Sequence, residues 1–163
     1  MKKCIVLVLL LPLLCGCAPE ETFERVYDEL LLPAMAPMAQ LNLQLPPEAT
    51  QAVLSNEDEE KLYFCNGYTV SVSTQESGDL DRTLKNLCGY GQDALTVLET
   101  AQGTHDRYDW VFTCAAEGGT QIGRGAVLDD GNYHYCVCVQ ADEAVSGSLD
   151  QAWDALFASM RLS

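Results

Sequence analysis

Basic side chains are scarce in this chain. Its 163 residues include nine Lys and Arg but 24 Asp and Glu, which gives a net charge of −15 at pH 7. Nucleic acids and anionic lipid headgroups carry the same sign, so this composition excludes nucleic acid as a partner and excludes membrane binding through surface charge. A long hydrophobic run is also missing. The longest, at residues 4–15, covers about a dozen residues, whereas a membrane-spanning helix needs about 20.

The N-terminus instead has the pattern of a secretory signal. Two lysines precede the apolar run and a small residue follows it, as in signal peptides. Residues 14–17, Leu-Cys-Gly-Cys, resemble the bacterial lipobox, in which a small residue precedes a cysteine that is lipidated and becomes the mature N-terminus. We therefore predict cleavage before Cys17 and a diacylglyceryl group, with palmitate-type chains, on its sulfur. Cleavage before Cys15, which the bulky Leu14 disfavours, and an ordinary signal that ends near Ala18 are the alternatives.

Three segments follow from this prediction. We expect a signal peptide at residues 1–16, a lipidated N-terminus with a short helix and connector at 17–40, and one domain at 41–163. Without the signal, seven basic and 24 acidic side chains remain, a net charge near −17. Two acyl chains suffice for stable anchoring, so Cys17 would hold the protein at the extracytoplasmic face of a bacterial cell membrane. Ala18 is not the Asp that retains lipoproteins at the inner membrane, and a Gram-positive membrane and an outer membrane both stay open.

Hydrophobic periodicity predicts an α+β domain. The first expected elements are a helix at 22–31, a half-buried strand at 41–45 and a hairpin about Asn66-Gly67. A helix at 80–88 follows, between a cap at Asp79 and a stop at Gly89. Four strands between 94 and 142 come next, and then a final helix that begins with a Ser148–Gln151 capping box. Short connections between successive strands require a mostly antiparallel sheet. Two amphipathic helices must then cover its faces, which gives a sheet of about six strands flanked by helices.

Several phrases in this order resemble a known superfamily. They are "LPPEA" at an early strand, "GYTVSVST" before the first domain helix, "VLDDGNYHYCVCV" in the last hairpin and "AWDALFASMRL" in the final helix. Together they resemble the superfamily of the photosystem protein PsbP, the Ran-binding protein Mog1 and bacterial lipoproteins such as LpqN and DcrB, and also uncharacterised acidic lipoproteins of gut Firmicutes. The resemblance covers about residues 41–162. It implies an α/β/α sandwich that binds other proteins or assists assemblies, and it implies no catalytic residue.

The cysteines leave disulfide formation open. An exported chain permits disulfides, but five cysteines remain besides Cys17, an odd number, and free cysteine also packs as a small hydrophobic residue. Candidate pairings join Cys114 to Cys136 or Cys138 and join Cys65 to Cys88. A chain without any disulfide is an equal alternative.

His134, Cys136 and Cys138 are the strongest candidates for chemistry because they share one face of a predicted strand. Side chains two residues apart on a strand lie about 6.5 Å apart, whereas two thiolates on one zinc lie roughly 3.8 Å apart. We therefore expect no metal site and no cofactor. A nucleophilic cysteine near His134 would need an exposed, activated thiolate, and a histidine among aromatic residues on a strand more often packs in the core.

Two further features have competing interpretations. Tyr133 and Tyr135 would form a binding surface typical of interfaces if no helix covers their face, and core residues otherwise. Gly123 and Gly125 mark a bulge or a place where the final helix packs close to the sheet.

These observations favour a non-enzymatic, membrane-anchored binding or assembly module. Its expected partner is a protein, and its ligand is not defined by the sequence. A redox-active or hydrolytic lipoprotein that uses a cysteine near His134 is the alternative, and a purely structural envelope protein is the third.

Overall fold

The computed structural model describes residues 37–53 and 60–163. The predicted signal peptide, Cys17 and the helix expected at 22–31 lie outside the described residues. Within these ranges, none of the helices combines the length and the hydropathy needed to cross a bilayer.

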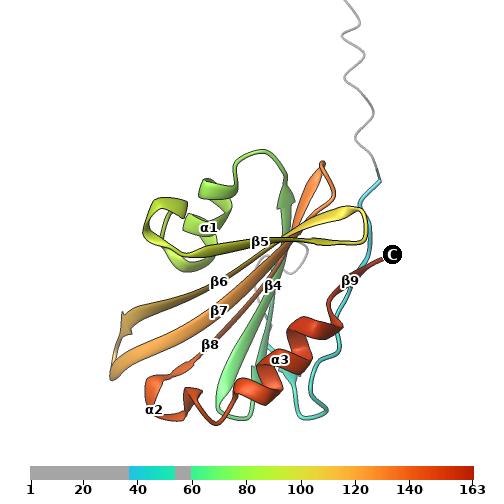
Figure 1. Ribbon diagram of the computed structural model, residues 1–163. Helices are drawn as coiled ribbons and strands as arrows, with labels where there is room; N and C mark the ends of the chain where they lie inside the picture. The colour runs from blue at the N-terminus through green and yellow to red at the C-terminus, as the bar shows by residue number, and fades with distance from the viewer. Residues whose placement is uncertain (1–36, 54–59) are drawn as a thin grey trace, which may run out of the picture. The chain divides into compact units, whose positions relative to one another are not determined.

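Seven strands form one antiparallel sheet in the order β2-β3-β4-β8-β7-β6-β5 (Figure 1). Their bounds are β2 Thr50–Gln51, β3 Glu60–Cys65, β4 Tyr68–Glu76, β5 Val97–Gln102, β6 His105–Ala116, β7 Gly119–Asp129 and β8 Tyr133–Asp142. A separate two-stranded sheet pairs β1 (Leu41–Asn42) with β9 (Arg161–Leu162). The helices are α1 Leu80–Cys88, the 3-10 turn η1 Gln92–Ala94, α2 Glu143–Ser146 and α3 Asp150–Ser159. The predicted α+β class and mostly antiparallel sheet are confirmed, and the main sheet has seven strands where about six were expected.

Local signals place most turns and ends as predicted. Gly67 has a φ of 88° in the β3–β4 hairpin, a conformation that favours glycine. Asp79 caps α1 by accepting a hydrogen bond from the Arg82 N–H, and α1 ends at Gly89 in the left-handed conformation. The strands β5 to β8 form the expected meander.

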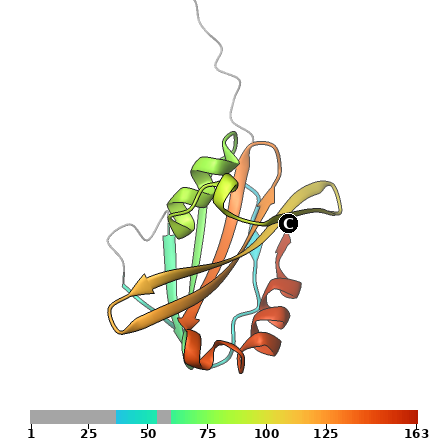
Figure 2. The same cartoon turned by 60° about the vertical axis from the view of Figure 1, so that its left-hand side comes forward.

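One helix lies on each face of the sheet (Figure 2). On the α1 face, Leu84 packs into a core with Trp110 and Phe112. A Cβ atom at Gly125 would lie 2.1 Å from the Trp110 ring, and one at Gly123 would lie 2.2 Å from the Phe112 ring. The two glycines therefore make room for aromatic rings of the neighbouring strand. The predicted bulge or close approach of the final helix is wrong as an account of them, because α3 packs against the opposite face.

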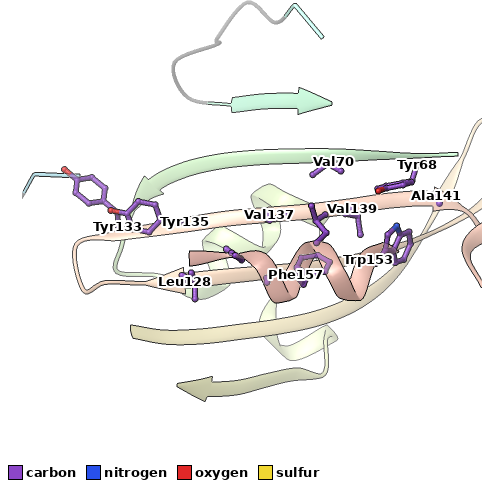
Figure 3. Close-up of a cluster of buried hydrophobic side chains, with 13 residues drawn as sticks. Tyr68, Val70, Leu128, Tyr133, Tyr135, Val137, Val139, Ala141, Trp153 and Phe157 are labelled. Carbon is purple, nitrogen blue, oxygen red and sulfur yellow. The ribbon is translucent and has the colours of Figure 1, made fainter. Parts of the chain in front are cut away.

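The α3 face carries the larger core (Figure 3). Trp153 and Phe157 of α3 pack against Val137 and Val139 of β8 and Val70 of β4. The segment before β2 adds three partly buried leucines to the same core: Leu41, Leu43 and Leu45.

Two predicted details of this region are wrong. The alternation at 41–45 predicts which leucines are buried, but only Leu41–Asn42 form a strand, because the Gln44 N–H donates to the Ser159 hydroxyl of α3 instead of to a neighbouring strand. The capping box is absent as well. The Ser148 hydroxyl donates to the carbonyl of Val145 at 2.7 Å, and α3 begins after Leu149 without a side-chain cap.

Candidate binding site at the open edge of strand β6

The predicted chemical site around His134 is part of the core. His134 is 2% exposed. Its Nδ1 lies 2.8 Å from the Thr83 hydroxyl of α1, and its Nε2 lies 3.3 Å from a carboxylate oxygen of Asp129. The other Asp129 oxygen accepts hydrogen bonds from the Ser77 hydroxyl and from the Gly131 N–H. This network joins α1 to β7 and β8. The Thr83 and His134 side chains in it are both buried.

The thiols near His134 have the wrong environment for a nucleophile. The Cys136 sulfur donates to the backbone carbonyl of His134 rather than to its imidazole. Burial raises the pKa of Cys136 from 9.0 to about 12, and burial, with the neighbouring thiol groups of Cys88, Cys136 and Cys114, raises the pKa of Cys138 to about 12. A reactive cysteine needs a lowered pKa and solvent access. The geometry therefore disfavours the redox or hydrolytic alternative.

None of the candidate disulfides is formed. All five cysteines in the described ranges are free. Cys65 packs against the α3-face core and Cys88 against the α1-face core, so the sheet separates them. Cys114 does share the α1 face with Cys136 and Cys138, as expected. No disulfide joins it to either of them. The described residues also contain no group of three or more acidic, His or Cys side chains arranged to hold a metal ion.

Tyr133 and Tyr135 do not form an exposed patch. They are 9% and 1% exposed, and their rings meet edge to face at 6.3 Å. The Tyr135 hydroxyl donates to the Asp130 carboxylate and accepts a hydrogen bond from the Ala39 N–H. The predicted surface is thus covered by the chain segment that precedes β2, which periodicity cannot reveal.

The open part of the molecule lies at the other side of the sheet, along β6. The pairing of β5 with β6 ends at Val97 and Trp110, whereas the pairing of β6 with β7 continues to Ala116 and Gly119. The β6–β7 hairpin therefore extends past the start of β5, as Figure 1 shows. Within the described chain, no strand lies beside residues 112–116 on the outer side of β6.

The register shows which backbone groups face this open edge. Ala116 and Gly119 close a two-residue turn, so they exchange backbone hydrogen bonds, and bonded and non-bonded pairs then alternate along the ladder. Cys114 consequently faces β7, while Thr113 and Ala115 direct their N–H and C=O groups outward. A second observation agrees, because the Tyr90 hydroxyl donates to the Thr113 carbonyl at 2.7 Å from outside the sheet.

An apolar groove of about 460 Å³ accompanies this edge. It lies between the β6 edge and the chain that connects α1 to β5. We call it the β6 groove, and its lining residues are Tyr90, Ala94, Leu95, Thr96, Val111, Phe112, Thr113 and Ile122. None of them is charged. Grooves of this size that are mostly apolar with a few polar groups are typical of binding sites.

Val111 of this groove and the neighbouring Leu98 form an exposed apolar surface on the α3 face. Leu98 is 62% exposed and Val111 is 61% exposed. Leu98 pairs with Asp109, so Val111 is its diagonal neighbour on the same face. The helix α3 contacts β6 and β5 elsewhere, where the Phe157 carbonyl accepts a hydrogen bond from Arg107 and the Met160 carbonyl accepts one from Gln102. It leaves Leu98 and Val111 exposed.

The wall of the β6 groove is fixed by α1. The Asp81 carboxylate accepts a hydrogen bond from the Gln92 N–H at 2.7 Å and pairs with Lys85. Both contacts, that with Lys85 first, lower the pKa of Asp81. They fold the connection after Gly89 back toward α1, which places Tyr90 beside β6.

Sequence reasoning missed this site. The site depends on a difference in strand length that the sequence pattern does not show: β6 has 12 residues and β5 has six. A strand that is longer than its neighbour must leave part of an edge unpaired.

Comparison with protein-family models found no match, and neither did comparison with curated protein sequences. Solved structures are similar at low identity. LpqN of Mycobacterium tuberculosis, described as involved in cell envelope biogenesis, matches with a TM-score of 0.53 at 11% identity over 77% of this chain and 84% of that one. The Ran-binding protein Mog1p of Saccharomyces cerevisiae matches with a TM-score of 0.50 at 12% identity over 75% and 89% of the two chains.

A protein of Bacteroides thetaiotaomicron matches with a TM-score of 0.52 at 13% identity, over 76% of this chain but only 45% of that one. The chain has the fold of these proteins. At such identities the likeness concerns architecture alone, so the α+β sandwich is supported independently of its predicted role.

Proposed function

We propose that this protein is a lipid-anchored binding module at the extracytoplasmic face of a bacterial membrane, and that it holds a protein partner at the β6 groove. The observation that carries this proposal is the coincidence, at one edge, of outward backbone groups, an uncharged groove and two exposed apolar side chains. Isolated exposed apolar residues are ordinary, but a contiguous set beside an unpaired strand is typical of an interaction site.

The anchoring part of the proposal is supported by the sequence of residues 14–17 and by the net charge. An acidic chain is repelled by anionic headgroups, so a covalent anchor at Cys17 would have to supply the attachment. The similarity to LpqN, described as involved in cell envelope biogenesis, is compatible with such a location.

The anchoring test is fractionation of cells that express the full chain or its Cys17→Ala variant. We expect the parent chain in the membrane fraction with two or three acyl chains by mass spectrometry, and the variant without them. A parent chain that carries no lipid would contradict the anchoring.

The binding test is site-specific photo-crosslinking in intact cells. A photoreactive amino acid is placed at Val111, which lines the groove, or at Phe64 on β3, which is similarly exposed at 53% and lies toward the other edge of the sheet. We expect one discrete adduct from position 111 that is absent from position 64 and that is lost when Leu98 is changed to Asp. Equal adducts from both positions, or none from position 111, would contradict a partner at this edge.

A further inference from the structure

We propose that the partner binds as an added β-strand: an extended, positively charged segment of another protein that pairs antiparallel with residues 112–116 of β6 and continues the line of β5. This inference rests on the proposed function and specifies how the same site works.

The backbone provides the first argument. The N–H and C=O groups of Thr113 and Ala115 point outward, and no strand of the described chain pairs with them. An added strand forms main-chain hydrogen bonds with such an edge whatever its side chains. The open stretch has the length of an ordinary short strand, and β7 already holds it on its inner side, so the edge is in strand conformation before anything binds.

The side chains provide the second argument. Residues of an added strand alternate between the two faces of the sheet. On the α1 face they would enter the β6 groove beside Phe112 and Leu95. On the opposite face they would contact Val111 and Leu98. Apolar surface on both faces of one edge fits a strand better than it fits a helix, which would cover only one face.

Charge provides the third argument and identifies the kind of segment. The chain carries a net charge of −15. The groove itself is uncharged. The acidic residue Asp93 precedes Ala94 of its lining, and Glu117 follows Ala116, the last residue of β6. A segment with apolar residues at its centre and Lys or Arg at its ends would complement this arrangement. A second copy of the chain would bring the same negative charge and is disfavoured.

Tyr90 would act as a cover over the edge. Its hydroxyl donates to the Thr113 carbonyl at 2.7 Å, and the side chain is partly exposed. An added strand has to replace this hydrogen bond with one from its own backbone N–H. The empty edge is thereby less exposed to unspecific pairing, a hazard that native edge strands commonly limit.

The test is a selection of random 12-residue peptides displayed on phage, with the full chain in detergent as the target. Clones are counter-selected on the Thr113→Pro variant, in which the outward N–H is replaced by a ring. Proline is tolerated at an edge where its N–H position faces solvent, and Thr113→Val keeps the N–H as the matched control. We expect selected peptides to carry net positive charge and alternating apolar residues, and to bind Thr113→Pro at least about tenfold more weakly than the parent or Thr113→Val.

A second measurement needs no variant of the protein. The best peptide is synthesised with N-methyl groups on alternate residues, in the two possible phases. We expect one phase to lose about tenfold or more in affinity and the other to lose little, because only one set of N–H groups faces β6. The inference is overturned if no peptide distinguishes the parent from Thr113→Pro, if both phases bind alike, if acidic peptides are selected, or if the full chain dimerises through this edge. If the photo-crosslinking test gives a discrete adduct at position 111 but the peptide tests fail, the proposed function stands and only strand addition is removed.

Discussion

The two halves of β6 differ in how many strands pair with them. Residues 106–110 pair with β5 on one side and β7 on the other, and Trp110, which packs over Gly125, is 2% exposed. Residues 111–116 pair with β7 alone, and their side chains range from the buried Phe112 to the exposed Val111. Both halves place apolar side chains on the α1 face, Tyr108 and Trp110 in the first and Phe112 and Cys114 in the second. The halves differ in whether a strand covers their outer edge.

If the second half binds a partner as proposed, stability and binding are separated along the strand. Side chains that face the α1 core hold the sheet together, and backbone groups that face outward in the second half contribute little to stability. Substitutions in the first half should therefore change folding, and substitutions on the open edge of the second half should change binding.

The largest difference is expected between two adjacent residues, Trp110 and Val111. Trp110→Ala removes a buried ring and leaves a cavity, so it should lower the free energy of unfolding by about 3–5 kcal/mol. Val111→Ala alters an exposed side chain and should change it by no more than about 0.5 kcal/mol. Urea denaturation of the full chain measures both, and similar losses would show that the open half is packed against something else.

A proline comparison tests the direction of the backbone groups. Cys114→Pro removes an N–H that bonds to β7 and should cost about 3 kcal/mol beyond the effect of Cys114→Ala. Thr113→Pro removes an outward N–H and should cost less than about 1 kcal/mol. If the order of the two losses is reversed in thermal or urea unfolding, the register derived for the edge is wrong.

The thiols extend the comparison from the open edge to the centre of the sheet. The folded-state pKa values of Cys136 and Cys138, about 12, lie above the ordinary value of 9.0. Between pH 9 and 12 the unfolded chain loses these protons while the folded chain keeps them, so stability falls as pH rises, by up to about 1.4 kcal/mol per pH unit for each thiol.

Unfolding of the double variant Cys136→Ala, Cys138→Ala should therefore depend less on pH in this range than unfolding of the parent. A parallel pH dependence would contradict buried, protonated thiols. In the native chain at pH 8, iodoacetamide should modify the half-buried Cys114 before it modifies either thiol of β8, and mass spectrometry of tryptic peptides measures the order.

A small change in stability is expected at Tyr90, which contacts the open edge of β6. Tyr90→Phe removes the hydrogen bond to the Thr113 carbonyl, which is partly accessible to water, so stability should fall by less than about 1 kcal/mol. The affinity for a selected peptide should rise a few-fold, since the added strand no longer displaces a hydroxyl. A loss of affinity would mean that Tyr90 contacts the partner directly.

Most features governed by neighbouring residues were predicted well, although the Ser148–Gln151 capping box was not. The cap at Asp79, the stop at Gly89 and the turn at Gly67 each depend on a few adjacent residues, and the structure has all three. The order of strands in the meander follows from short connections, which also act locally.

Features governed by residues far apart in the sequence were not predicted. The strand at Leu41 pairs with Leu162, more than a hundred residues later, and nothing in either segment specifies the other. The burial of Tyr135 depends on Ala39 in the same way. Periodicity distinguishes the two faces of a strand, but the covering of a face depends on segments elsewhere in the chain, which is why the predicted tyrosine surface proved to be core and the open edge of β6 was overlooked.

Residue-resolved hydrogen exchange of the full chain, free and with a selected peptide, tests the central claim most directly. In the free chain the amides of Thr113 and Ala115 should exchange rapidly while that of Cys114 is protected by β7. With the peptide bound, Thr113 and Ala115 should become protected and Cys114 should change little. Protection of Thr113 and Ala115 in the free chain, or protection on binding that appears elsewhere and not at these two amides, would contradict an open edge that accepts a strand.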